Sequence, residues 1–238
     1  MRKITFENNE IYHIINRGVE KRNIFLDDKD YLRFMHDLYE FNDEAPAENI
    51  YYKSINLESY EAKPRKILRE RKLLVEILAF CLMPNHYHLL LRQKNNNGIA
   101  KFMQKLGTGY TMSFNKKYKR IGSLFRGPFN AILINKESHF LNLPYYIHLN
   151  PLDIEFPEWR ERKLKDYNKA IEFLNNYRWS SHLDYLGEHN FPSVINREFL
   201  LDVFGRQDKY KQNTEKWLQE MKTYDIQDIA LEPQILRG

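Results

Sequence analysis

The chain has 238 residues and a net charge of +5, with 42% hydrophobic and 29% charged residues. This composition provides a packed core under a polar surface, and the basic excess is compatible with a polyanionic partner. The single cysteine, Cys81, excludes a disulfide framework and a cysteine-rich zinc site. No segment has the apolar length of a signal peptide or a membrane span, so we expect a cytoplasmic protein with no membrane partner.

Residue patterns in the first 92 positions predict three strands and one helix. Alternating apolar residues indicate a strand over 10–18, and an apolar stripe of helical spacing indicates a helix over 27–42. Residues 43–72 are polar and mixed, and we interpret them as an insertion. Residues 73–92 are rich in β-forming side chains around Met83-Pro84-Asn85, which predicts two strands joined by a hairpin turn.

The next sixty residues predict a helix, a strand and a second helix. Residues 95–120 carry an apolar stripe of helical spacing, 123–135 read as a strand, and 136–151 are again helical. Gly127-Pro128 indicates a bulge or a sheet edge within the strand pattern. Pro144 should kink the last helix or start its regular part.

The order of these elements defines the expected fold class. Four strands separated by helices in the order β-α-ββ-α-β-α are typical of an α+β protein, with an antiparallel sheet and helices packed on one face. A charged segment follows Pro157, and further helical stretches come after it. We therefore expect a first domain over 1–155, which carries the sheet, and a helical C-terminal extension over 156–238.

Two histidines lie one residue apart in the second strand of the predicted hairpin. Side chains alternate along a strand, so His86 and His88 point to one face and Tyr87 to the other. Neutral imidazole is the commonest metal ligand in proteins, and two rings on one face can converge on one ion. The alternative is a histidine pair on a solvated sheet face. The apolar run at 89–91 favours a site.

The last predicted helix offers a tyrosine and an amide on one face. Tyr146 and Asn150 are four residues apart, which places them side by side on a helix. An amide oxygen beside a phenol suits a hard metal ion. The alternative is that the residues at 145–147 are core and that Asn150 caps the helix before Pro151.

Two motifs, "MPNHYHLLL" and "YIHLNP", resemble those of the single-tyrosine HUH transposases, in particular the transposases associated with repetitive extragenic palindromes. HUH denotes two histidines around one hydrophobic residue. Four further stretches are similar to the family in the same order, and the resemblance covers most of residues 10–187: "YHIINRGVEKRNIF", "FMQKLGTGYTMSFNKKY", "GSLFRGPFNAILI" and "YRWSSHLDYLG".

The resemblance implies a ferredoxin-like sheet and a DNA strand transferase. Tyr146 takes the role of the nucleophile, which would form a 5′-phosphotyrosine. His86, His88 and Asn150 take the role of ligands to Mg²⁺ or Mn²⁺. The implied partner is single-stranded or hairpin DNA, and relatives include both monomers and homodimers. Tyr145 shares a helix face with Leu141 and Leu149, so we expect it to be buried.

A basic surface is predicted on the long helix and beyond it. The lysines share the face of the predicted helix over 95–120 that is opposite to the apolar stripe of this helix. Two arginines follow the helix, and one comes from the first strand. The predicted DNA-binding residues are Lys101, Lys105, Lys116, Lys119, Arg120, Arg126 and Arg17. The alternative for each is a solvated surface charge. Gly107 and Gly109 weaken the helix, and either indicates a close approach of another segment. Tyr110 and Trp179 are expected in the core.

Two other functions remain open at this point. A replication-initiator-type HUH nickase shares the order of histidines and tyrosine, whereas relaxases usually place the tyrosine first. A domesticated, non-catalytic binder of hairpin nucleic acid would be marked by loss of His86, His88 or Tyr146, and all three are present. A serine hydrolase and a P-loop enzyme are excluded, because their glycine-containing motifs are missing.

Overall fold

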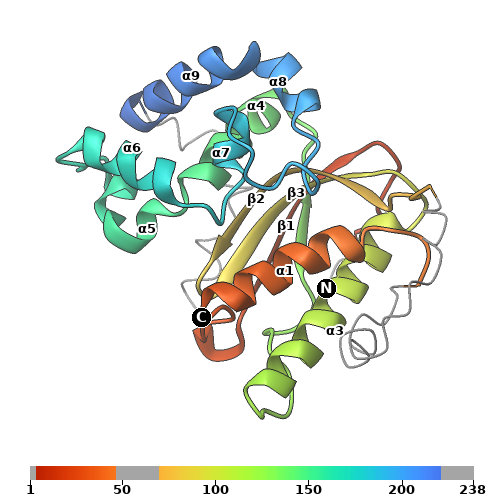
Figure 1. Ribbon diagram of the computed structural model, residues 1–238. Helices are drawn as coiled ribbons and strands as arrows, with labels where there is room; N and C mark the ends of the chain where they lie inside the picture. Colours follow the sequence, from red (N-terminus) through yellow and green to blue (C-terminus); the bar gives the residue numbers. More distant parts are fainter. Residues whose placement is uncertain (1–3, 47–69, 221–238) are drawn as a thin grey trace, which may run out of the picture.

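The computed structural model describes residues 4–46 and 70–220 (Figure 1). Most of the predicted insertion over 43–72 lies outside the described residues. Four strands form one sheet in the order β2-β3-β1-β4, and every pair is antiparallel. The strands are β1 Ile11–Arg17, β2 Val75–Met83, β3 His86–Gln93 and β4 Asn130–Leu133. This order, with helices between the strands, confirms the expected α+β, ferredoxin-like fold.

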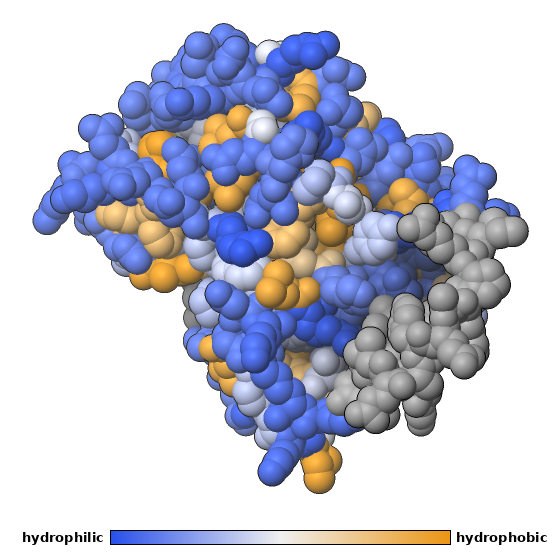
Figure 2. All heavy atoms as spheres, viewed as in Figure 1, coloured by the Kyte–Doolittle hydropathy of each residue, from blue (hydrophilic) through white to orange (hydrophobic). Residues whose placement is uncertain are grey.

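Helices α1 and α3 cover one face of this sheet (Figure 1). Helix α1, Asp28–Glu40, begins where the Asp27 carboxylate accepts a hydrogen bond from the Asp30 amide, an N-cap that satisfies an otherwise unpaired donor. Its buried stripe packs on α3, Gly98–Lys117, and on every second strand residue, in a cluster that includes Phe34, Tyr87 and Tyr110. The outer surface of this side is largely hydrophilic (Figure 2).

The opposite face of the sheet is covered as well, by α4 and the C-terminal helices. Helix α4, Glu137–Leu149, contacts β2 and β3. It shares a buried cluster with the helices that follow, α5 Leu152–Glu155, α6 Tyr167–Asn176, α7 His182–Tyr185, α8 Glu198–Phe204 and α9 Arg206–Glu220. The cluster joins strand residues such as Leu78 to Trp159 and Trp217, so residues on both sides of position 155 share one core. The domain boundary at 155 stays a prediction.

A segment beyond α6 also completes the outer edge of the sheet. The Leu82 amide donates to the Trp179 carbonyl, the Ser181 amide donates to the Phe80 carbonyl, and the Ser181 hydroxyl accepts from the Phe80 amide. An exposed edge strand leaves unpaired backbone groups, and this segment pairs those of β2. None of the helices in the described ranges has the length and apolar character that a membrane crossing requires.

Two predicted element bounds were wrong in detail, and so was the prediction that Pro144 could start the regular part of its helix. Helix α3 ends at Lys117, and Lys119 lies beyond it with a left-handed φ of 51°. The strand predicted over 123–135 is reduced to β4, because Pro128 has no N–H to donate and the residues before it form only an isolated bridge between Gly18 and Phe125. Helix α4 continues through Pro144, which neither starts nor ends it.

Candidate active site

The register of the sheet places both histidines on the face that α4 covers. His88 lies opposite Ile15 and Cys81, and His86 lies opposite Arg17 and Met83. Directly opposed residues in an antiparallel pair project to the same side. The two rings lie with centroids 5.0 Å apart, almost perpendicular to each other. The turn that holds them is the predicted hairpin, Pro84-Asn85, between β2 and β3.

A neighbour engages the Nδ1 atom of each histidine. The Asn85 side-chain oxygen lies 2.6 Å from Nδ1 of His86, so this nitrogen carries the proton. Nε2 of His13 lies 2.9 Å from Nδ1 of His88. Metal-binding histidines use their second nitrogen in this way, which fixes the tautomer and the orientation of the ring. If either ring binds a metal ion, Nε2 is the atom that would do so.

His88 is held in its neutral form. It is fully buried, and burial lowers its pKa to about 3, with the positive charge of Arg160 acting in the same direction. A protonated imidazole cannot bind a metal ion, whereas a neutral one can. His88 is therefore in the ligand-competent form over the physiological pH range.

Tyr146 faces the histidines, and Tyr145 faces away from them. The Tyr146 ring lies 6.2 Å from the His88 ring and is buried at the inner face of α4. The Tyr145 ring packs on Phe204 and Tyr210 of the C-terminal helices, at centroid distances of 5.0 and 5.5 Å. Tyr145 is buried as predicted.

The helix face proposed for Tyr145 was wrong at one residue, because Leu141 is exposed. Leu149 is fully buried on that face. His148 lies in a buried cluster where its ring nitrogens meet the hydroxyl groups of Ser181 and Tyr210.

Asn150 follows the last residue of α4, and its amide orientation is fixed by two hydrogen bonds. The Asn150 Nδ2 group donates to the Tyr146 carbonyl at 2.8 Å, and Asn150 Oδ1 accepts from Nη2 of Arg160 at 2.9 Å. Nη1 of Arg160 lies 3.2 Å from the Tyr146 hydroxyl. One guanidinium therefore touches both oxygens that the resemblance assigns to the chemistry.

The donor set around the histidines suits a divalent metal ion. Two imidazoles come from β3, and one amide oxygen comes from the end of α4, which contacts β3. A carbonyl oxygen has two lone pairs, so it can accept from Arg160 and bind a cation as well. No group of three His, Cys, Asp or Glu side chains suited to a metal occurs in residues 4–46 and 70–220. A third ligand from these residues must be of another kind, such as this amide.

The predicted DNA-binding residues do not form one surface with the histidines. Helix α3 lies on the opposite face of the sheet, so Lys101 and Lys116 are exposed on the far side. The Lys105 ammonium donates to the backbone carbonyls of Asp43 and Ala45, and the expectation that it lies in an open lysine stripe was wrong. Lys119 lies outside the helix and does not share its face.

Two of the three predicted arginines, Arg17 and Arg126, lie at one end of β1, and the third lies at the end of α3. Arg17 is buried on the histidine face, opposite His86, and its carbonyl accepts from the amide of Arg126. Arg126 is exposed. Arg120 donates to the side-chain oxygen of Asn115 at 2.9 Å. Of the predicted basic residues, Arg17 is placed directly on the histidine face.

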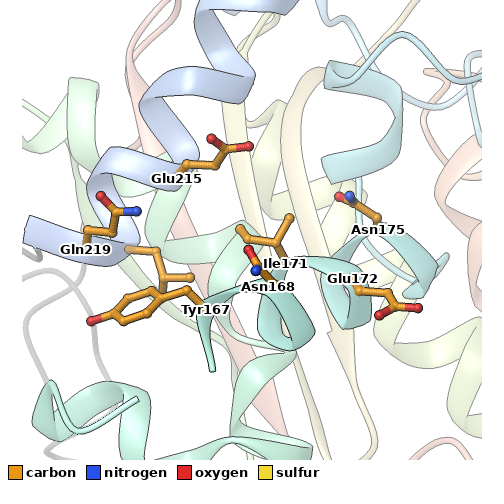
Figure 3. Close-up of a pocket in the computed structure, with 8 residues that line it drawn as sticks. Tyr167, Asn168, Ile171, Glu172, Asn175, Glu215 and Gln219 are labelled. Atoms are coloured by element: carbon orange, nitrogen blue, oxygen red, sulfur yellow. The ribbon is translucent and has the colours of Figure 1, made fainter. Parts of the chain in front are cut away.

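A pocket elsewhere in the molecule has the wrong charge for DNA. It has a volume of about 350 Å³ and lies between α6 and α9 (Figure 3). Glu172 and Glu215 line it together with amides and apolar side chains, and no basic residue is among the lining side chains. Carboxylates repel phosphates, so this pocket does not extend the histidine site.

Sequence reasoning missed two residues of the site. His13 had no local signal, because its position beside His88 depends on the pairing of β1 with β3. Arg160 lies in a short 3₁₀ helix, Pro157–Glu161, beyond the predicted domain boundary. The alternation along the first strand predicts that His13, Ile15 and Arg17 share one face. It cannot show that this face is also the face of His86 and His88, because that depends on how the strands pair.

Comparison with known proteins finds a similarity to one family over part of the chain. The family model described as IS200-like transposase matches residues 48–149. Among solved structures, the chain is similar to one described as a REP-associated tyrosine transposase bound to a REP hairpin, with 12% identity, a TM-score of 0.49, and coverage of 82% of this chain and 89% of that one. A search of the curated proteins finds no match.

The matched segment carries His86, His88 and Tyr146, and it ends one residue before Asn150. The resemblance to the single-tyrosine transposases is thereby confirmed over this segment. It is shorter than the 10–187 over which the motifs are similar. Arg17 and Arg160 both lie outside it.

Proposed function

We propose that the protein is a metal-dependent transposase that cleaves and rejoins single-stranded DNA through Tyr146. The observation that carries the proposal is the placement of this phenol across from His88, at the inner face of α4, while Tyr145 is turned into the core. The IS200-like family match over 48–149 supports the same reaction class.

The chemistry is a transesterification. The Tyr146 oxygen attacks the scissile phosphorus, a P–O bond to tyrosine forms, and the P–O3′ bond breaks. The phenol loses its proton, and the leaving 3′ oxygen gains one overall. Because one phosphodiester replaces another, the bond energy is kept and a later strand can be joined without ATP. This agrees with the missing P-loop motif.

Each residue of the site has a role in that step. A phenol has a pKa near 10, so it is a weak nucleophile at neutral pH unless the site assists it. A divalent ion held by His86, His88 and Asn150 would polarise the scissile phosphate and offset its developing charge. Arg17, on the same face as His86, would contact a DNA phosphate.

The DNA would continue past the end of β1. Successive residues of this strand point to opposite faces, so Asn16 lines a groove of about 570 Å³ between α3 and the segment 123–129, while Arg17 lies on the histidine face. The groove also has Met112 and Phe129 in its walls, and Arg126 lies beside it. Apolar walls and nearby cations suit unpaired bases and their phosphates.

A covalent product tests the proposal. Incubation with a single-stranded hairpin oligonucleotide and Mn²⁺ should yield a protein–DNA species that survives denaturing electrophoresis. Chelation of the metal should abolish it. DNA binding without any adduct would favour a non-catalytic hairpin-binding protein. Cleavage without a covalent species would indicate that water is the nucleophile, and it would contradict the proposal.

A further inference from the structure

Arg160 joins the two oxygens of the site. Its Nη1 group donates to the Tyr146 hydroxyl and its Nη2 group donates to Asn150 Oδ1, at 3.2 and 2.9 Å. The guanidinium also lies 5.3 Å from the centre of the Tyr146 ring. These contacts bring a residue from beyond the family match into direct contact with the proposed nucleophile.

The position of Arg160 is fixed from behind. Its Nε and Nη2 groups donate to the two carboxylate oxygens of Asp153, at 2.7 and 2.6 Å. The Trp159 indole donates to the same carboxylate at 2.6 Å, and Trp159 is itself buried. A guanidinium held by a carboxylate in this two-point geometry has little freedom to move. Asp153 also neutralises its charge, which lowers the repulsion toward a metal ion at Asn150 Oδ1.

The geometry suits an arginine and no other side chain. Tyr146 and Asn150 are one helical turn apart, and the Asn150 amide is tied to the Tyr146 carbonyl. Only a planar fork with several donors can contact both oxygens and Asp153 at once. A lysine would supply one charge at one point.

We propose that Arg160 is a further catalytic residue, which holds the nucleophilic oxygen of Tyr146 and the metal-binding oxygen of Asn150 in one arrangement. This inference rests on the proposed function. It predicts that loss of Arg160 affects metal binding and phosphotyrosine formation together, because one group orients both oxygens.

Metal binding is measured first, with Mn²⁺ alone and no DNA. Removing only Arg160 would leave Asp153 uncompensated, and its charge would attract the ion. The informative variant is therefore Arg160→Gln combined with Asp153→Asn, which keeps the net charge constant. Titration followed by electron paramagnetic resonance should show Mn²⁺ affinity weakened by roughly 10–100-fold, the range for residues that orient metal ligands. Unchanged or tighter binding would overturn the proposal.

The second measurement is the rate of adduct formation at saturating Mn²⁺. Arg160→Ala should lower this rate by roughly 10²–10³-fold, as expected for loss of one donor at a reacting oxygen. Millimolar guanidinium should restore part of it, and Arg160→Lys should restore less than half. The matched control is Arg178→Ala, which removes an exposed arginine stacked on Trp179 and should keep the wild-type rate.

These outcomes separate the two proposals. A wild-type protein that forms no adduct would contradict the proposed function, while the Mn²⁺ titration would still report on the link between Arg160 and Asn150. An adduct rate unaffected by Arg160→Ala would show that this arginine is structural. If Arg160→Ala does not fold, Arg160→Lys carries the comparison, because it keeps the charge and the apolar stem.

Discussion

Nε2 of His13 lies 2.9 Å from Nδ1 of His88, and both rings are buried on the face of the sheet that α4 covers. The rings are nearly parallel, with centroids 5.2 Å apart. If Nδ1 of His88 donates this hydrogen bond, Nε2 of His88 keeps its lone pair for a metal ion. His13 therefore controls which nitrogen of His88 is available.

The first prediction concerns this pair. His13→Phe keeps a flat ring but removes the acceptor, so we expect Mn²⁺ affinity to fall by roughly 10–100-fold. His13→Gln retains an acceptor oxygen, so its Mn²⁺ affinity should fall less than that of His13→Phe. Titration with Mn²⁺ measures both. His189→Phe, at an exposed histidine, is the control and should bind Mn²⁺ like the wild type. Full affinity in His13→Phe would show that His13 does not orient His88.

The sequence alone was sufficient for features that depend on local periodicity. The two-residue period of a strand placed His86 and His88 on one face, and the helical period separated Tyr145 from Tyr146. The same periods indicated the order of strands and helices, from which an antiparallel α+β sheet could be expected, while the ferredoxin-like topology was implied by the family resemblance. In each case the signal lies within a few residues, so no knowledge of the tertiary contacts is needed.

Features that depend on strand pairing or on the path of the chain could not be predicted in this way. The helical period grouped the lysines of α3, but it did not show that α3 covers the face opposite to the histidines. His13 reaches His88 only through the register of β1 on β3. Arg160 contacts Tyr146 because the 3₁₀ helix Pro157–Glu161 lies beside α4, and the sequence has no pattern that indicates this position.

The second prediction compares two glycines in α3. A Cβ atom at Gly107 would meet nothing within 4 Å, whereas one at Gly109 would lie 2.5 Å from ring atoms of Phe41. Gly107→Ala should therefore raise the free energy of unfolding by about 0.5–1 kcal/mol, because alanine favours the helix. Gly109→Ala should lower it by about 1–3 kcal/mol, because the buried Phe41 must shift. Urea unfolding measures both. Equal effects would mean that α1 does not approach α3 at Gly109.

The third prediction concerns how DNA binding depends on salt. Lys101 and Lys116 are exposed on the face away from the histidines, so neutralising both with glutamine should weaken hairpin binding without slowing cleavage at saturating protein. Each lost phosphate contact reduces the slope of log affinity against log salt by about 1. Arg126→Gln should reduce the slope and also the cleavage rate, since Arg126 adjoins Arg17. If the two lysine substitutions leave the slope of log affinity against log salt unchanged, α3 does not contact the DNA.

The fourth prediction is a dependence of stability on pH. His182 is buried against Tyr210, Asn175 and His148, and burial lowers its pKa to about 4. Below pH 6.5 the unfolded chain takes up a proton here that the folded protein does not. The free energy of unfolding should therefore fall as the pH drops from 6.5 toward 4, by about 1.4 kcal/mol per pH unit for this residue.

His182→Gln isolates that contribution. The variant should lose about 1 kcal/mol at pH 7, where a hydrogen bond to Tyr210 is weakened, and its stability should fall less steeply with acid than that of the wild type. Urea unfolding at pH 7, 6 and 5 gives both slopes. Parallel slopes would show that His182 can be protonated in the folded protein.

The last prediction distinguishes two adjacent tyrosines. Phenylalanine keeps the ring and removes only the hydroxyl. Tyr146→Phe should fold and bind hairpin DNA but form no covalent adduct, because the attacking oxygen is gone. Tyr145→Phe should retain cleavage, since its ring packs on Tyr210 and its hydroxyl accepts only a 3.3 Å hydrogen bond from Asn213. We expect it to lose at most about 1 kcal/mol of stability.

Denaturing electrophoresis with a labelled hairpin and Mn²⁺ compares the two variants directly. The choice of Tyr146 depends on the orientation of α4, which turns this residue toward His88 and Tyr145 toward α8 and α9. An adduct in Tyr146→Phe that is lost in Tyr145→Phe would mean that α4 presents its other face during the reaction. An adduct in both variants would assign the nucleophile to another residue, and the roles of Asn150 and Arg160 beside Tyr146 would fail with it.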